Sequence, residues 1–123
     1  MEIIDLPHLW NEGMQNYLGI TPPNDREGCL QDPHWFDGAW GYFPTYTLGA
    51  MIAAQLFESA KAKIPEISPG IAKGNFKPLF NWLNSNVYSQ GSALTANELL
   101  IKATGKSLDP AIFISHLEKR YLE

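Results

Sequence analysis

The spacing of apolar residues along the chain predicts helices. Over residues 5–18 they recur every three or four positions, which marks one face of a helix that Gly19 ends. The same spacing over residues 76–87 predicts a second amphipathic helix, and a short helix is expected over residues 65–73. No stretch shows the alternation of apolar and polar residues that is typical of a half-buried strand.

Capping sequences mark where the last two helices begin. Thr95 and Glu98 form the pattern of a capping box, so a helix is expected from there to about Gly105. Asp109 before Pro110 pairs an N-cap residue with a first-turn proline, and predicts a helix that runs close to the C-terminus. The chain is therefore predicted to be all-α, with about six helices in a single domain of residues 1–123.

The most apolar of the predicted helices covers about residues 45–63, with Pro44 at its start. In its first half only Thr47 and Gln55 interrupt a run that is apolar on every side of the helix. Helices of this kind are buried within a larger body. We therefore expect a buried central helix, and packing in the core is the simplest reason for its composition.

Charge and composition exclude several classes of partner. Nine basic and thirteen acidic residues give a net charge of −4, which argues against nucleic acid and anionic membranes as partners. No apolar run reaches the roughly 18 residues of a membrane-spanning helix, and the N-terminus does not resemble a signal peptide. Cys29 is the only cysteine, so no internal disulfide forms, and a cytoplasmic location is expected.

An irregular, aromatic-rich segment over residues 28–46 precedes the central helix. Six of the fifteen aromatic residues of the chain fall between Trp35 and Tyr46, and the segment also holds three glycines and two prolines. Gln31, Asp32 and His34 place polar groups among them. Constrained turns, large apolar surfaces and polar groups that need partners together predict a functional site.

Within this segment the Asp32–His34 pair offers the most chemistry. Pro33 biases Asp32 toward an extended conformation, which would send both side chains to one side. A carboxylate beside an imidazole can fix its tautomer for donation to an anionic or carbonyl ligand. Alternatively, Gln31, Asp32 and His34 satisfy backbone groups in an irregular turn. The residues alone leave both interpretations open.

Other kinds of chemistry find less support. Tyr42 and Tyr46 lie four residues apart at the predicted start of the central helix, where they would share a face and either donate to a ligand or pack in the core. The three histidines show no i, i+4 pair and the pattern H-E-x-x-H is missing, so no metal ligand is assigned. No pattern of a nucleophile with its base, or of a phosphate-binding loop, occurs.

Residues 28–35, with the sequence GCLQDPHW, resemble the G-x-x-Q-D-x-H-W signature of the carboxypeptidase Taq family of zinc metallocarboxypeptidases. The resemblance covers essentially the whole chain. It includes the segments LP–WN at residues 6–11, YLG at 17–19, PPND at 22–25, GYFPTY at 41–46, AAQL at 53–56, GNF at 74–76 and ATG at 103–105.

The resemblance implies a mostly helical zinc enzyme that removes C-terminal residues from peptides, often as a homodimer. In that family the H-E-x-x-H helix, the glutamate that completes the zinc site and the substrate-binding arginines lie upstream of the matching region. No cofactor is therefore expected in this chain, although zinc belongs to the full-length family. The resemblance also implies that Gln31, Asp32 and His34 line the substrate groove, with His34 the best candidate for substrate contact. Tyr42 and Tyr46 are second candidates, for binding or for stabilising an oxyanion, and no residue is assigned as catalytic.

Three interpretations follow from the resemblance. The chain is a C-terminal fragment or truncated relative of such a carboxypeptidase, inactive alone. Alternatively, it is one subunit of a split peptidase, complemented by a separate chain that carries the zinc site, and binds peptide substrate only when complemented. The third interpretation is a non-catalytic helical module that binds a peptide or small carboxylate near His34. Self-association is expected in each case, because a missing partner leaves apolar surface exposed.

Overall fold

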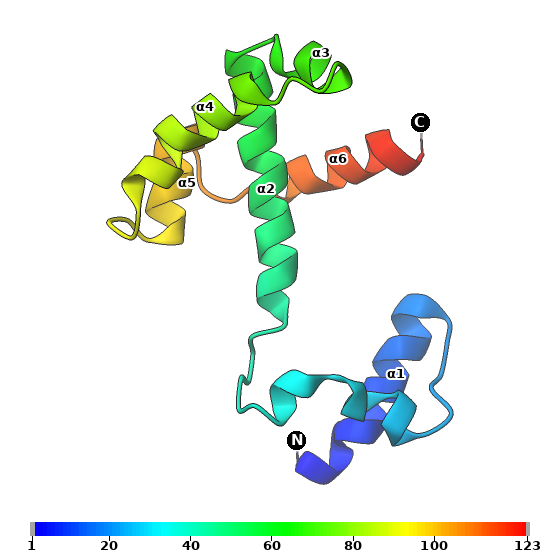
Figure 1. Cartoon of the computed structure of the whole chain (residues 1–123). Helices are drawn as coiled ribbons and strands as arrows, with labels where there is room; N and C mark the ends of the chain where they lie inside the picture. Colours follow the sequence, from blue (N-terminus) through cyan, green and yellow to red (C-terminus); the bar gives the residue numbers. More distant parts are fainter. Residues whose placement is uncertain (1, 123) are drawn as a thin grey trace. The chain divides into compact units, whose positions relative to one another are not determined.

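The computed structural model describes residues 2–122, which form two compact units that meet in the sequence between Phe43 and Pro44. That residues 1–123 form a single domain stays a prediction. Residues 2–122 form six α-helices and several short 3₁₀ turns without any strand, so the predicted all-α fold is confirmed (Figure 1). None of the helices in this part of the chain is both long and apolar enough to cross a membrane.

The first unit consists of one α-helix and four 3₁₀ turns. The helix α1 (Leu6–Leu18) follows η1 (Ile3–Asp5) and precedes η2 (Asp25–Glu27), η3 (Cys29–Gln31) and η4 (Pro33–Trp35). It ends as predicted at Gly19, whose φ of 71° is a left-handed conformation that favours glycine. Its start is less regular, because the Asp5 carboxylate accepts a hydrogen bond from the Glu2 N–H at 2.8 Å instead of capping α1.

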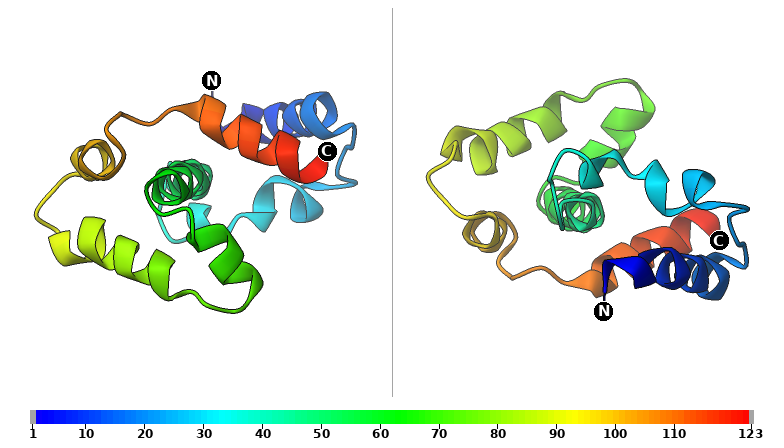
Figure 2. Two further views of the ribbon diagram at one scale, coloured as in Figure 1. Left: turned by 90° about the horizontal axis from the view of Figure 1, so that it is seen from above. Right: turned by 90° about the horizontal axis from the view of Figure 1, so that it is seen from below.

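The second unit is organised around its longest helix. Its elements are α2 (Pro44–Lys63), α3 (Ile67–Ala72), α4 (Lys77–Asn86), η5 (Tyr88–Gln90), α5 (Ala96–Thr104) and α6 (Pro110–Tyr121). The helix α2 contacts each of the other four α-helices, which confirms its central place. When the unit is viewed along α2, α5 is also seen end-on, whereas α4 and α6 lie across the view (Figure 2).

The apolar core of this unit lies around the C-terminal half of α2. Its buried members are Ala60 of α2, Ile67 of α3, Trp82 of α4 and Ala103 of α5. Burying a large apolar side chain contributes about 1.5–3 kcal/mol. Ile67 and Trp82 therefore hold α3 and α4 against α2, while the small Ala60 and Ala103 let α2 and α5 approach closely.

Both predicted caps form. The Thr95 hydroxyl accepts a hydrogen bond from the Glu98 N–H at 3.3 Å, and the Glu98 carboxylate accepts one from the Thr95 N–H at 2.9 Å. Asp109 accepts from the Ala111 N–H at 3.1 Å in the first turn of α6. The bond from the Thr95 N–H, followed by that from its hydroxyl, lowers the pKa of Glu98. The hydrogen bond from the Lys106 side chain, followed by that from the Ala111 N–H, lowers the pKa of Asp109.

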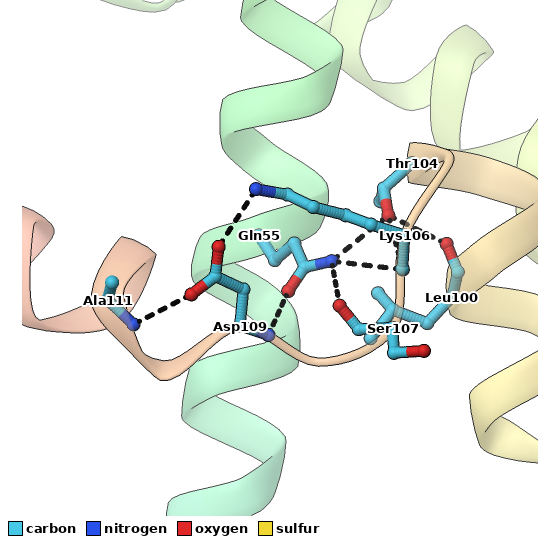
Figure 3. A network of polar contacts seen from close by, with 7 residues as sticks. All are labelled: Gln55, Leu100, Thr104, Lys106, Ser107, Asp109 and Ala111. Atoms are coloured by element: carbon cyan, nitrogen blue, oxygen red, sulfur yellow. Dashed lines mark hydrogen bonds and ion pairs between the residues drawn. The ribbon is translucent and has the colours of Figure 1, made fainter.

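A buried amide joins α2 to the connection between α5 and α6. The side chain of Gln55 is only 1% exposed. Its Nε2 donates to the Thr104 hydroxyl at 3.1 Å and to the carbonyls of Lys106 and Ser107 at 3.3 and 3.0 Å, and its Oε1 accepts from the Asp109 N–H at 2.9 Å (Figure 3). Because buried polar groups must find partners within the protein, these bonds fix the path of residues 104–109.

We expect the substitution Gln55→Leu to destabilise the second unit by about 2–4 kcal/mol, because it removes four hydrogen bonds between α2 and residues 104–109 at almost unchanged volume. Chemical denaturation followed by circular dichroism measures the change. Gln15→Leu is the matched control, since Gln15 is an exposed helical glutamine, and should stay within about 0.5 kcal/mol of the unsubstituted chain. Equal stability of the two variants would contradict a structural role for Gln55.

Candidate functional site

The site lies in the first unit and begins at Gly28. A Cβ atom at this position would lie 3.1 Å from Pro22 Cβ and 3.2 Å from the Asn24 carbonyl oxygen, which is tight enough to explain the glycine. Asn24 caps η2 by accepting a hydrogen bond from the Glu27 N–H at 3.1 Å. The next residue, Cys29, is buried at 3% exposure. This packing sets the direction in which the chain enters η3.

Aromatic contacts hold the following turn against α1. The ring of Trp35 meets the edge of Trp10, a residue of α1, with centroids 6.5 Å apart. It also meets Trp40 in a perpendicular contact, with centroids 5.2 Å apart. Edge-to-face pairs of this kind add about 0.5–1.5 kcal/mol each beyond the area that they bury. Trp35 thus anchors the turn that carries His34.

Asp32 and His34 come together as predicted, but for a different reason. Asp32 is extended, with φ −81° and ψ 108°, whereas His34 lies in the helical turn η4, so alternation along an extended segment is wrong. The Asp32 side chain instead folds over the turn. Its Oδ1 accepts a hydrogen bond from the His34 N–H at 3.0 Å and lies 2.5 Å from His34 Nδ1. This is the local capping geometry that aspartate favours before a helical turn.

The electrostatics of the pair follow from this geometry. Both side chains are mostly buried, with 14% of Asp32 and 20% of His34 exposed. Burial alone would raise the pKa of Asp32, but the hydrogen bonds from the His34 N–H and ring, together with the charge of the ring, lower it below its ordinary value. Since a carboxylate accepts hydrogen bonds, the short contact assigns the proton to Nδ1 of the imidazole.

A series of turns brings Tyr42 back beside His34. The Ala39 N–H donates to the His34 carbonyl at 2.9 Å, and the Tyr42 N–H donates to the Ala39 carbonyl at 3.2 Å. Gly38 and Gly41 allow these turns with φ of 72° and 74°. The Tyr42 ring then stacks on the imidazole with centroids 5.3 Å apart and planes 29° apart.

Phe43 completes the surroundings of the imidazole and was missed by the sequence reasoning. Its ring meets that of His34 nearly perpendicularly, with centroids 5.5 Å apart. The density of aromatic residues over residues 35–46 indicated that rings would contact one another there. Composition does not show which two rings form a contact. Asp32, Tyr42 and Phe43 thus hold the plane of the imidazole from three directions.

The structure corrects the expected placement of Tyr42 and Tyr46 and shows which group the Gln31 side chain contacts. Tyr42 precedes α2, which begins at Pro44, so the prediction that it shares a helix face with Tyr46 is wrong. Tyr46 lies in α2 of the second unit and is 59% exposed. The Gln31 side chain donates to the Arg26 carbonyl at 2.5 Å, which is the backbone-satisfying arrangement left open above. The functional roles of Gln31, Asp32, His34, Tyr42 and Tyr46 stay predictions.

The described residues do not fit a catalytic metal. Residues 2–122 contain no group of three or more histidine, cysteine, aspartate or glutamate side chains that could hold a metal ion. No chemical step is therefore assigned to a metal held by this part of the chain. What the arrangement provides is an imidazole whose orientation is fixed by a carboxylate and two aromatic rings, suited to binding and orienting a polar ligand.

A model of the Carboxypeptidase Taq (M32) metallopeptidase family matches residues 1–121. The thermostable carboxypeptidase 1 of Pyrococcus furiosus is 42% identical over 118 residues, which are 96% of this chain and 24% of the relative. Carboxypeptidase 1 of Bacillus subtilis is 41% identical over 121 residues, 98% of this chain and 24% of the relative. The solved structure of Trypanosoma cruzi metallocarboxypeptidase 1 matches with a TM-score of 0.95 and 44% identity, over 100% of this chain and 26% of that one. The chain thus spans about a quarter of the length of these relatives.

We expect Asp32 to titrate below the usual range of aspartate, and His34→Ala to raise its pKa toward that range, because the contribution of the ring is lost. A group whose pKa is lowered by folding stabilises the folded state above its unfolded pKa. The pair's contribution to local stability should therefore be lost as the pH falls through the pKa of folded Asp32. NMR titration of the Asp32 carboxyl measures both effects. His8→Ala, on the exposed surface of α1, is the control and should leave the titration unchanged. An identical Asp32 titration in the His34→Ala chain would disprove the coupling.

Proposed function

The chain belongs to the Carboxypeptidase Taq (M32) metallopeptidase family, and on that basis we propose that it forms the substrate-side wall of the active-site groove in a metallocarboxypeptidase. The observation that carries this proposal is the oriented Asp32–His34 pair within the G-x-x-Q-D-x-H-W signature. Fixing a ring by a carboxylate and by two aromatic contacts is costly to build, and is useful when the ring must meet a ligand in one geometry.

In this proposal the imidazole of His34 binds the C-terminal end of a peptide. Because Nδ1–H is bonded to Asp32, only the protonated imidazole has an Nε2–H, which can pair with the C-terminal carboxylate or donate to a peptide carbonyl. Asp32 keeps the ring in one tautomer and orientation. The rings of Tyr42 and Phe43 restrict its rotation and shield the contact from water, which strengthens a hydrogen bond to a charged group.

The hydrolytic chemistry itself requires groups that residues 2–122 do not assemble. We propose that the catalytic zinc and the general base come from polypeptide corresponding to the other three quarters of the relatives. A metal in that position would activate water and polarise the scissile carbonyl. Without that polypeptide the chain is inactive, and with it the chain binds and orients the peptide. Its lone cysteine, which is buried, fits the reducing cytoplasm, where we propose that the protein works.

A chimera tests the proposal. Residues 2–122 replace the matching segment of the Bacillus subtilis carboxypeptidase 1, and release of the C-terminal amino acid from a short peptide is measured. We expect an active, metal-dependent chimera. His34→Ala should lower kcat/KM by about 10- to 100-fold, the value of a hydrogen bond to a charged group.

Two further variants sharpen this test. Asp32→Asn should cause a smaller loss, since it keeps the ring but weakens its orientation, while the exposed His8→Ala should leave kcat/KM unchanged. Full activity of the His34→Ala chimera would refute a substrate-side role. A folded chimera that binds the peptide and releases no amino acid would instead favour the non-catalytic binding module.

A further inference from the structure

The first half of α2 combines a buried type of sequence with an exposed position. Its residues are apolar on every side, the composition of a helix enclosed by protein. In the structure, however, all residues from Pro44 to Ala50 are exposed, including Leu48 at 45%. The fully buried residues of α2, Gln55 and Ala60, lie in its second half. The sequence of the first half thus matches an environment that the second unit does not itself provide.

A hollow of about 260 Å³ lies beside this exposed stretch. We call it the α2–α5 pocket, and it is lined by Leu48, Ile52, Ala96, Asn97, Leu100 and Leu108. None of these residues is charged, so an occupant with a charged group would lose its hydration without compensation. For comparison, an apolar cavity of about 150 Å³ holds a benzene molecule. The α2–α5 pocket therefore suits one or two apolar side chains of another polypeptide segment.

The exposed surface of the whole chain indicates a larger missing contact. A compact protein of this mass exposes about 6,600 Å², and two separate compact bodies with the masses of the two units expose about 7,900 Å². The chain exposes 9033 Å². The excess over two separate bodies is roughly 1,100 Å², comparable to the ~800 Å² that each partner buries in a stable protein–protein interface.

The relatives indicate what covers this surface. The Trypanosoma cruzi structure reproduces the backbone over the whole of this chain, yet about three quarters of that protein lies outside the match. We propose, building on the function proposed above, that the α2–α5 pocket receives apolar side chains from the polypeptide that supplies this remaining portion. A second copy of the chain is the competing occupant, because a self-associating chain would cover the same residues.

A two-part complex tests this inference. The probe is Bacillus subtilis carboxypeptidase 1 from which the segment matching this chain has been deleted, titrated with the complete chain by calorimetry. We expect a 1:1 complex. Leu48→Glu should weaken it by about 30-fold or more, because the carboxylate would be buried in the α2–α5 pocket without a partner. The matched control is Ile101→Glu, since Ile101 is an aliphatic residue of α5 with a similar exposure of 41% outside the pocket, and should change the affinity by less than about threefold.

A second variant guards against a folding defect. Ala96→Glu introduces a carboxylate from the opposite wall of the pocket, in the first turn of α5, where a negative charge favours the helix. Circular dichroism verifies that both pocket variants keep their helices, and each should weaken the complex. Failure of the folded probe to bind, or equal weakening by Leu48→Glu and Ile101→Glu, would overturn the proposal. So would a homodimer of the chain alone that Leu48→Glu dissociates, because it would identify the occupant as a second copy.

The result of this binding experiment can be told apart from the result of the chimera experiment that tests the proposed function. His34 lies in the other unit, so the His34→Ala chain should bind the probe as tightly as the unsubstituted chain. A complex that depends on Leu48, together with a chimera that is unaffected by His34→Ala, would remove the substrate-side role and leave the docking surface standing. The reverse combination would remove the docking surface alone.

Discussion

The second unit depends on the requirement that a buried amide satisfies all of its hydrogen bonds. Gln55 meets this requirement through Thr104 at the end of α5 and through residues of the α5–α6 connection, 49 to 54 positions further along the chain. These bonds fix the path of the chain on both sides of Leu108 and so help to place one wall of the α2–α5 pocket. The polar network and the apolar pocket therefore both depend on the hydrogen bonds of Gln55, since a shift of the α5–α6 connection would break the network and move a wall of the pocket.

The same principle operates at shorter range in the first unit. No residue of α1 is buried, and Cys29 is the buried apolar residue among the turns at residues 24–43. Much of the conformation of these turns comes from side chains that satisfy nearby backbone groups, such as Asn24 at η2, Gln31 at the Arg26 carbonyl and Asp32 at the His34 N–H. Stacked aromatic rings then add the apolar contacts that a regular core would otherwise supply. A site on such turns is positioned by many weak, local contacts.

The range of each interaction explains how much the sequence could predict. The capping box of Thr95 and Glu98, the Asp109–Pro110 start and the end of α1 at Gly19 involve partners within a few residues, so they are visible in the sequence. The Asp32–His34 contact was predicted for the same reason. In contrast, the partners of Gln55 lie about fifty residues away, and no local pattern marks them.

The error at Tyr42 also has a local physical cause. Spacing alone placed Tyr42 and Tyr46 on one helix, but the left-handed conformation of Gly41 turns the chain before α2 begins at Pro44. Glycine and proline occur both at helix starts and in the turns that precede them, so the spacing could not show whether Tyr42 lies in the helix or in the turn before it. The ring of Tyr42 consequently stacks on His34, a contact that depends on the sum of several turns and is not encoded at any one position.

The division between local and long-range contacts bears on how this part of the family's fold could work. The Asp32–His34 pair is held by residues two positions apart, so it can form before any other polypeptide arrives. A ring that is already oriented loses little conformational entropy when it meets a ligand. The apolar half of α2 is the opposite case, because its burial needs surface from elsewhere. If assembly covers that half of α2, the hydrophobic effect drives the association, while the chemistry of the site is set in advance by short polar contacts. Affinity for the partner and orientation of the imidazole are then determined by different residues, and either can change in evolution without loss of the other.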